Sequence, residues 1–387
     1  MAPSASRSHA KPNVVVIGAG VIGLGVAWRL AQGGAGVTVF DRGASGRGAS
    51  HASAGILAAS AEAEPSEEPL VALGRRSQSL WPAFAAELEQ LTGQSVDLRT
   101  EGALAVALTA DDQARLRHHF EYQRRLGLPL EWLSAAETRR REPHLSARLA
   151  GAVFMPADHQ VENRKLAAAL RAAVLAAGAT LREHTPVERI LIADGRAVGV
   201  ALADGTRVPA DTVVLAAGAW SRQIEGLPTE LLPPVRPVKG QIVALQMDAA
   251  APLVRHVVWA PGVYIVPRLD GRLLLGATVE EKGFDPALTA GGILSLLEAA
   301  WRTIPAIEEL PVAEMWVGHR PGSRDDAPIL GPAAIDGLVY ATGHHRNGIL
   351  LTPVTADTVS RYVLAGEIDP VMQPFDIARF APARAAE

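Results

Sequence analysis

The stretch VVVIGAGVIG, residues 14–23, decides the fold. Four β-branched apolar residues end at a glycine cluster, and an alanine-containing segment suited to a helix follows as far as Leu30. This order predicts a strand, a tight turn and a helix. The glycines match the pattern G-x-G-x-x-G, in which Gly18 permits the turn, Gly20 lets a pyrophosphate approach the backbone, and Gly23 lets the helix pack on the strand. Free N–H groups at the helix N-terminus would stabilise the charge of such a diphosphate.

Two further features strengthen this motif, which alone is weak evidence. A second apolar strand, residues 37–40, ends in Asp41, about twenty residues further on, where a carboxylate would accept hydrogen bonds from ribose hydroxyls. A glycine-rich segment, residues 33–36, supplies the helix stop between the two strands. The alternative is a glycine-rich turn in a βαβ unit without a nucleotide, which the combination of strand, spacing and acid disfavours.

Composition excludes several classes of function. The 387 residues suffice for two domains, and 48% hydrophobic with 20% charged residues is typical of a globular chain. A net charge of −4 gives no reason to expect a nucleic-acid partner. No apolar run reaches the roughly 18–20 residues of a membrane span. The first residues contain no apolar core of a secretory signal, so the cytoplasm is the expected compartment. Cysteine is absent, which excludes disulfides and thiolate chemistry.

The hydrophobic pattern alternates between two characters and predicts two domains, each built from discontinuous segments. An α/β dinucleotide-binding domain is expected from residues 11–75, 152–235 and 325–375, with a three-strand meander at 188–209. A mixed α+β domain with an antiparallel sheet is expected from residues 76–151 and 236–324, and residues 1–10 and 376–387 are expected to be tails. The acidic stretch 62–68 contains proline and is expected to be an exposed loop. Ligands should bind where the two domains meet.

Motifs along nearly the whole chain resemble those of a known family. The opening GAGVIG with Asp41 is followed in order by GASHASAGIL, TPV, DTVVLAAGAWS, PVKGQ, YIVPR, GHRPGSRDDAPILG and GHHRNGILLTP. This series is similar to that of the FAD-dependent amino-acid oxidases, and among them to bacterial glycine oxidases of the thiamine pathway. The resemblance implies a Rossmann-like FAD-binding domain with a mixed sheet and a β-meander, joined to an α+β substrate domain, in the architecture of D-amino-acid oxidase and glutathione reductase.

The resemblance also implies which residues bind FAD. The loop 49–56 would line the isoalloxazine, Val187 would lie near the adenine, and the helix from Leu350 would direct its N-terminus at the flavin pyrimidine oxygen. The expected FAD-binding residues are Gly18, Gly20, Val21, Ile22, Gly23, Asp41, Arg42, Ala49, Ser50, His51, Ala54, Gly55, Ile56, Val187, Ala217, Gly218, Trp220, Arg320, His345, Arg346, Asn347, Gly348, Ile349 and Leu350.

Two positions depart from the family pattern. The sequence also limits the ways in which the flavin could be attached to the protein. Asp41 stands where glutamate is commoner, and Val279 stands where some relatives have methionine. Attachment of flavin through cysteine is excluded, because the chain has none. A histidyl link through His51 is the alternative to non-covalent FAD, which we expect.

Oxidation of an amino acid to an imino acid requires few protein groups. The protein must hold the carboxylate, orient Cα–H toward flavin N5 and favour the neutral amine. Arg320 ends an apolar strand and precedes Pro321, and it is predicted to bind the substrate carboxylate because its planar fork matches that group. The alternatives are a surface arginine or an internal salt bridge.

Tyr264 and Arg346 complete the expected catalytic set. Tyr264 lies among apolar residues, and its hydroxyl needs a partner, which the substrate carboxylate would provide; the alternative is a core tyrosine bonded to backbone. Arg346 would contact the substrate carboxylate or a flavin oxygen, or instead hold its own loop through backbone carbonyls. His344 and His345 are adjacent, so their side chains would point to opposite faces of an extended segment, and we expect structural roles for them. No cluster has metal-ligand spacing, so no metal is expected.

Together these observations predict an FAD oxidase that converts glycine, with sarcosine and small D-amino acids as further candidates, to the imine. The imine would hydrolyse to glyoxylate or another keto acid and ammonia, while O2 would be reduced to H2O2. The alternatives are a D-amino-acid dehydrogenase that passes electrons to a quinone, a non-catalytic flavin-binding subunit of a complex, and an NAD-dependent dehydrogenase. The family suggests a homo-oligomer, a tetramer. Neither the preferred side chain nor the physiological electron acceptor follows from the sequence.

Overall fold

The opening stretch folds as its glycines predict. The computed structural model describes residues 11–65 and 67–381, and in it β1 (Asn13–Ile17) leads through a tight turn into α1 (Val21–Gln32). The next strand, β2 (Gly36–Phe40), pairs with β1 in parallel. Gly18 has a φ of +106°, and a Cβ there would lie 2.4 Å from the carbonyl oxygen of Ala216. A Cβ at Gly23 would lie 1.9 Å from the carbonyl oxygen of Gly18, so the helix packs this closely only because residue 23 is glycine.

Around β1 a six-stranded sheet forms, here called the parallel sheet, because only its edge strand β18 runs antiparallel. Its order is β18 (Ile329–Pro332), β19 (Leu338–Thr342), β12 (Thr212–Leu215), β1, β2 and β8 (Thr180–Arg182). Side chains alternate along β1, so Val14 and Val16 join one core while Val15 and Ile17 join another. The sheet is therefore buried on both faces.

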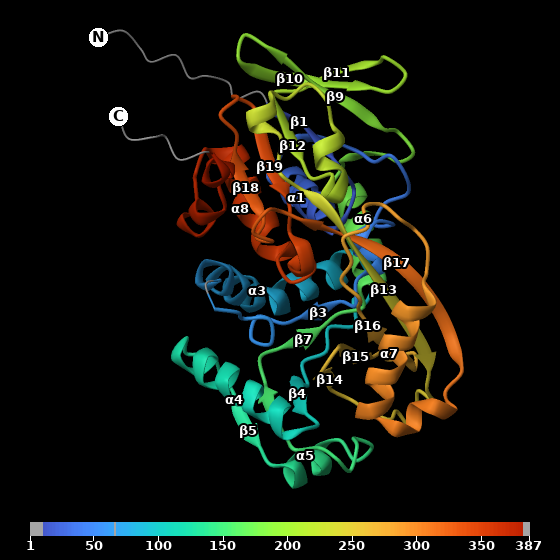
Figure 1. Cartoon of the computed structure of the whole chain (residues 1–387). Coiled ribbons are helices and arrows are strands. Elements are labelled where there is room, and N and C mark those ends of the chain that lie inside the picture. The colour runs from blue at the N-terminus through green and yellow to red at the C-terminus, as the bar shows by residue number, and fades with distance from the viewer. Residues whose placement is uncertain (1–10, 66, 382–387) are drawn as a thin grey trace.

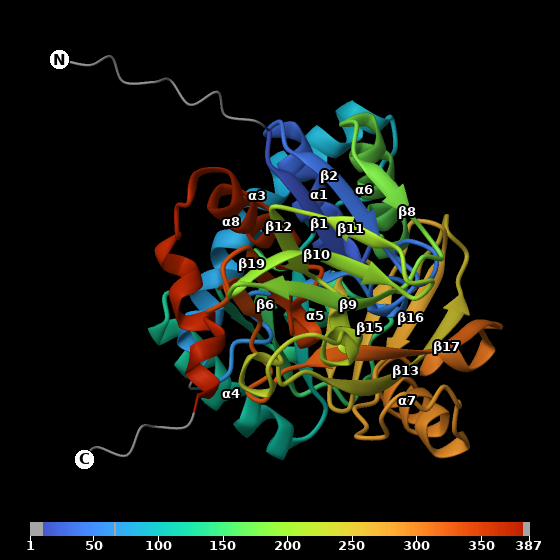
Figure 2. The ribbon, with the colours of Figure 1, turned by 90° about the horizontal axis from the view of Figure 1, so that it is seen from above.

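Helices cover one face of the parallel sheet and a meander covers the other. The helices are α1, α3 (Glu68–Thr92), α6 (Asn163–Ala176) and α8 (Thr352–Ala365). The meander consists of β9 (Val187–Ala193), β10 (Arg196–Leu202) and β11 (Arg207–Pro209). Figure 2 looks onto the meander, with β1 and β12 beside it. The predicted meander at 188–209 is confirmed.

A second, eight-stranded sheet, here called the large sheet, forms the lower part of the molecule in Figure 1. Its order is β17 (Val312–Gly322), β13 (Arg236–Gln246), β16 (Arg272–Gly276), β15 (Val263–Pro267), β14 (Val257–Ala260), β4 (Ala103–Ala107), β6 (Gly151–Met155) and β5 (Glu131–Leu133). Neighbours are antiparallel except β14 and β4. The helix α7 (Ala290–Thr303) packs on one face through Leu296 and Ala300.

Short elements connect these layers. Two helices, α4 (Ala110–Arg125) and α5 (Ala135–Arg141), flank the β4–β6 end of the large sheet. A short helix α2 (Ala49–Ala52) precedes the small ribbon of β3 (Ile56–Leu57) and β7 (His159–Gln160). The part of the chain that the structure describes also contains six 3-10 helices: Gly218–Gln223, Thr229–Leu231, Pro305–Glu309, His345–Asn347, Pro370–Phe375 and Ile377–Phe380. The long strands β13 and β17 pair along their length and join the lower part to the upper part (Figure 1).

The packing corrects three expected boundaries. The segment from residue 76 is expected in the second domain, yet Trp81 and Leu88 are buried in the helical core beneath the parallel sheet. Residues 152–155 are expected with the first domain, yet β6 pairs with β4 and β5 of the large sheet. The C-terminal tail is expected from residue 376, yet Ile377 is buried and Arg379 pairs with Asp325. The rest of the expected tails, residues 1–10 and 382–387, lies outside the described residues.

Candidate active site

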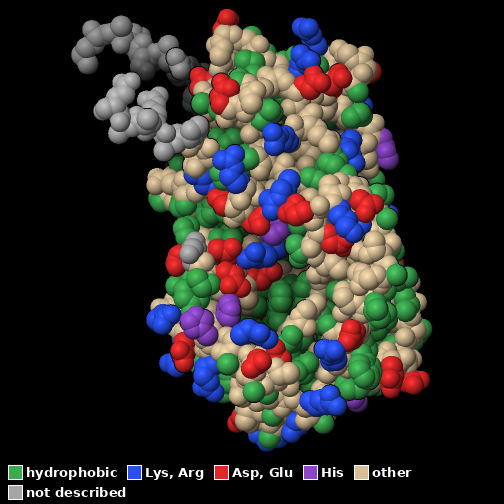
Figure 3. Space-filling view, viewed as in Figure 1, with side chains coloured by type: hydrophobic (Ala, Val, Ile, Leu, Met, Phe, Trp, Pro, Cys, Tyr) green, Lys and Arg blue, Asp and Glu red, His purple; other side chains and the backbone are tan. Residues whose placement is uncertain are grey.

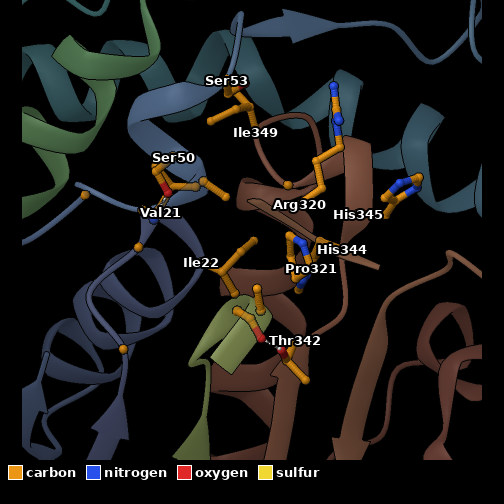
Figure 4. Close-up of a pocket in the computed structure, with 18 of the residues that line it drawn as sticks. Val21, Ile22, Ser50, Ser53, Arg320, Pro321, Thr342, His344, His345 and Ile349 are labelled. Carbon is orange, nitrogen blue, oxygen red and sulfur yellow. Dashed lines mark hydrogen bonds between the residues drawn. The ribbon is translucent and has the colours of Figure 1, made fainter. Parts of the chain in front are cut away.

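A cavity of about 940 Å³ lies where the two sheets meet. One wall comes from the glycine turn after β1, the end of β2, residues 42–56 and the turns that follow β12 and β19. The opposite wall comes from β14, β15, β16 and β17 of the large sheet. Figure 4 shows Val21 and Ser50 on one side of the cavity, with Arg320 and His345 on the other. The expected position of the ligand site, between the domains, therefore coincides with this cavity.

At the glycine turn, the geometry fits a dinucleotide. The first turn of α1 has neither a side-chain cap nor an acidic residue, and its Val21 N–H donates to Ser50 Oγ at 3.0 Å. Asp41 Oδ2 accepts from Ala19 N at 2.7 Å and Oδ1 accepts from Gly43 N at 2.8 Å. Each carboxylate oxygen keeps a lone pair for a ribose hydroxyl. A helix N-terminus without an acidic residue in its first turn, together with an oriented acid, is what the pyrophosphate and ribose of FAD require.

The loop that is expected to line the flavin ring is held by two buried side chains. Asn163 Nδ2 donates to the carbonyl oxygens of Ser50 and His51 at 2.8 and 3.0 Å. Arg268 Nη2 donates to the carbonyl oxygen of Ala54 at 2.8 Å. Burial lowers the pKa of Arg268 to about 10, so this guanidinium remains charged at neutral pH. Neither Asn163 nor Arg268 lies in a sequence motif that indicates support of this loop.

Arg320 and Tyr264, predicted from separate strands, meet in the cavity. Arg320 lies on β17, and its Nη1 donates to the carbonyl oxygen of Thr278 at 3.1 Å. The guanidinium rests on Gly240, where a Cβ would lie 2.5 Å from Nη1. Burial raises the pKa of Tyr264, while the positive charge of Arg320 opposes that rise. A guanidinium that donates to one backbone carbonyl oxygen and keeps further N–H groups for a ligand, beside a phenol, forms a suitable receptor for a carboxylate.

Arg346 lines the cavity but is already paired with carboxylates. Its Nη2 donates to Glu67 Oε2 at 2.8 Å and to the carbonyl oxygen of Glu62 at 3.3 Å, and its Nε lies 3.6 Å from Glu62 Oε1. These contacts tie Arg346 to residues 62 and 67 and not to its own loop, and its contact with the substrate or flavin stays a prediction. The stretch 62–68 is also not wholly an exposed loop, because Glu62 lines the cavity and α3 begins at Glu68.

Five residues of the expected FAD set do not line the cavity: Gly23, His51, Gly55, Asn347 and Leu350. Their contact with FAD stays a prediction. The carbonyl oxygen of Leu350 accepts from Ser77 and Trp81, and α8 begins only at Thr352. Burial lowers the pKa of His51, with a further contribution from nearby Arg164.

The histidines after β19 differ from each other. His344 Nε2 lies 3.1 Å from Thr355 Oγ1, and burial lowers the pKa of His344 to about 3. His345 has a φ of +45°, and burial lowers its pKa to about 4 although Asp326 lies 3.8 Å away. Both therefore carry no charge at neutral pH, and both line the cavity.

Several cavity residues were missed at the sequence level. Trp259 packs edge-to-face against Tyr264, with ring centroids 5.6 Å apart. It belongs to β14, a strand that the alternation of apolar residues did not reveal. Glu62 was missed because it lies in an acidic stretch that resembles a solvated loop. Among the described residues, no group of three or more His, Asp and Glu side chains could hold a metal ion.

These features define a class of protein. Residues 13–362 match the family model described as FAD dependent oxidoreductase, so the chain belongs to this family and is an FAD-dependent enzyme. The resemblance drawn from the sequence motifs is thereby confirmed, as is the expected fold. In residues 11–65 and 67–381, we find no helix with both the length and the apolar character needed to cross a bilayer.

Similarity to individual proteins gives more specific information than the family match. The glycine oxidase of Geobacillus kaustophilus is 39% identical over 95% of this chain and 97% of its own length. The crystal structure of glycine oxidase from Geobacillus kaustophilus matches with a TM-score of 0.88 at 37% identity, covering 96% of this chain and 100% of that one. The bifunctional protein ThiO/ThiG of Trichormus variabilis is 38% identical over 95% of this chain and 55% of its own length.

Proposed function

We propose that this protein oxidises glycine, and with lower preference sarcosine and small D-amino acids, to the imino acid. The imino acid hydrolyses to glyoxylate or the matching keto acid and ammonia, and O2 is reduced to H2O2. The observation that carries the proposal is the pairing of Arg320 with Tyr264 inside the cavity, because it forms a carboxylate receptor opposite the dinucleotide-binding turn. The similarity to glycine oxidases supports the choice of substrate.

Different groups of residues bind the cofactor, bind the substrate and exclude water. The turn at Gly18, the first turn of α1 and Asp41 hold the pyrophosphate and ribose of FAD, which when bound accepts the hydride of the substrate. Arg320 and Tyr264 hold the substrate carboxylate and so orient Cα–H. The rigid loop 49–56, fastened by Asn163 and Arg268, excludes water from one side. Attachment of FAD is non-covalent, supported by the absence of cysteine and by the position of His51 outside the cavity lining.

Aromatic and apolar side chains lie beside the proposed carboxylate receptor. Trp259 and Tyr264 pack together on one wall, and Ile56 lines the cavity as well. Val279 also lines the cavity and is 71% exposed. One methylene changes selectivity by about 1–3 kcal/mol, so measured specificity constants for glycine, sarcosine and D-alanine will rank these substrates.

The electron acceptor decides between the proposal and its main alternative. Purified protein is mixed with glycine under air, and O2 uptake, H2O2 and glyoxylate are measured. Equal amounts of all three support the oxidase. Turnover that requires an added quinone, with little O2 uptake, supports the dehydrogenase instead. Reduction of added NAD⁺ without a bound flavin would overturn both.

Three broader expectations belong to the same proposal. A cytoplasmic location and a homo-oligomer, with a tetramer suggested by the family, are checked by cell fractionation and by light scattering of purified protein. A role in thiamine biosynthesis is checked by deleting the gene and testing growth without thiamine. The surface in Figure 3 has basic and acidic side chains interspersed, which supports the absence of a nucleic-acid partner.

A further inference from the structure

Glu62 is a carboxylate in the cavity that has no part in the functions described so far. Its side chain is 21% exposed and lines the cavity. The backbone just before it is fixed, because Ser60 N and Ala61 N donate to the buried carboxylate of Asp158 at 3.0 and 2.8 Å. A carboxylate on a rigid backbone, facing the cavity, is in a position to bind a ligand.

The carboxylate of Glu62 is only loosely paired. Among the described residues its ion-pair partner is Arg346, with Nε at 3.6 Å, whereas Glu67 takes a 2.8 Å hydrogen bond from the same guanidinium. Arg320 lies near enough for its charge to lower the pKa of Glu62, and the charge of Glu62 in turn contributes to the raised pKa of Tyr264. The remaining charged neighbours are the carboxylates of Asp158 and Glu67. Lone pairs of Glu62 therefore remain free in a cavity whose other wall binds carboxylates.

We propose that Glu62 binds the ammonium group of the amino-acid substrate and takes one proton from it. The inference rests on the proposed function, since it places the substrate carboxylate on Arg320 and Tyr264. An amino acid is a zwitterion near neutral pH, so a receptor needs a cation for one end and an anion for the other. Glu62 supplies the anion and Arg320 the cation.

The proton transfer prepares the oxidation. The N–H bond of the ammonium breaks, an O–H bond forms on Glu62, and the amine keeps the electron pair. In the FAD-loaded enzyme, the lone pair freed by Glu62 would stabilise the cation left at Cα when hydride passes to the flavin. Both electrons of the C–H bond would leave with the hydride, and the nitrogen lone pair would become part of the C=N bond. Burial raises the pKa of Glu62 to about 7, which suits a group that must accept and later release a proton.

The test compares Glu62→Gln with Glu67→Gln. Both variants remove one acidic partner of Arg346, but only the first removes the proposed proton acceptor. We measure the rate of flavin reduction by glycine without oxygen, and kcat/KM, between pH 5.5 and 9.5. Wild type should gain kcat/KM as the pH rises through about 7, because Glu62 must be ionised to accept the proton. Glu62→Gln should lose roughly 100-fold or more at pH 8 and lack this inflection, recovering only at high pH, where the amino group of free glycine is already deprotonated.

The controls distinguish this role from a structural one. Glu67→Gln should stay within about threefold of wild type, and Glu62→Asp should keep the inflection and recover at least tenfold over Glu62→Gln. Equal losses in Glu62→Gln and Glu67→Gln, or an unchanged pH profile in Glu62→Gln, would overturn the proposal. Binding of acetate, followed by the flavin spectrum, should be retained in Glu62→Gln because acetate has no ammonium group. Failure of the proposed function is recognised separately, since wild type would then not be reduced by glycine.

Discussion

Replacing Arg320 with alanine is predicted to remove the carboxylate receptor while FAD stays bound. One of the five N–H groups of Arg320 is used by the carbonyl oxygen of Thr278, which leaves enough donors for a bidentate contact with the substrate. Two charge-assisted hydrogen bonds contribute about 3–4 kcal/mol. At 1.4 kcal/mol for each factor of ten, kcat/KM for glycine should fall roughly 100- to 1,000-fold. Because the contact forms already in the bound substrate, most of the loss should appear in KM.

The assay is the initial rate of H2O2 formation as a function of glycine concentration, with FAD content determined from the visible spectrum of each preparation. Arg302→Ala is the matched control, since Arg302 lies on α7, is 64% exposed and pairs with Glu298. It should leave KM unchanged. A normal KM in Arg320→Ala with full FAD content would refute the assignment of Arg320. Loss of FAD instead would show that Arg320 mainly holds the cofactor.

Three further predictions follow from close contacts. Gly240→Ala places a Cβ 2.5 Å from Arg320 Nη1, so it should displace the guanidinium and raise KM for glycine about tenfold or more, without loss of FAD; an unchanged KM would contradict this contact. Gly18→Ala puts a methyl group 2.4 Å from the Ala216 carbonyl oxygen at a φ of +106°, so FAD titration of the purified protein should show weakened binding. Lys239→Met leaves Asp285 without the buried ammonium that now lies 2.7 Å away, and urea unfolding should show a loss of about 2 kcal/mol; unchanged stability would mean that this pair contributes nothing net.

Much of the fold was predictable because its signals are local. The glycine pattern at residues 14–23 could be interpreted directly, because a Cβ at Gly18 or Gly23 would overlap a backbone carbonyl. The alternation in β1 likewise reflects a sheet buried on both faces. The domain boundaries were harder to predict from the sequence. Trp81 and Leu88 have the spacing of any amphipathic helix, and nothing in that spacing says which sheet the helix covers.

The candidate site was predictable where a residue lies near one end of a recognisable strand: Arg320 lies near the end of β17, and Tyr264 lies near the start of β15. Residues whose role depends on a distant partner were harder to predict. Arg346 is paired with Glu62 and Glu67, nearly three hundred positions earlier in the chain, and no local pattern reveals this. Glu62 itself was taken for a loop residue because acidic stretches are usually solvated. Site residues whose roles depend on contacts between distant segments therefore could not be predicted from the sequence.

The central claim is tested most directly by the visible spectrum of the purified protein before and after anaerobic addition of glycine. The account predicts a yellow protein that glycine bleaches and that regains its colour in air with formation of H2O2. Bleaching by D-alanine but not by glycine would keep the fold and the site but contradict the proposed substrate. A protein that stays yellow with every amino acid tested would contradict the account.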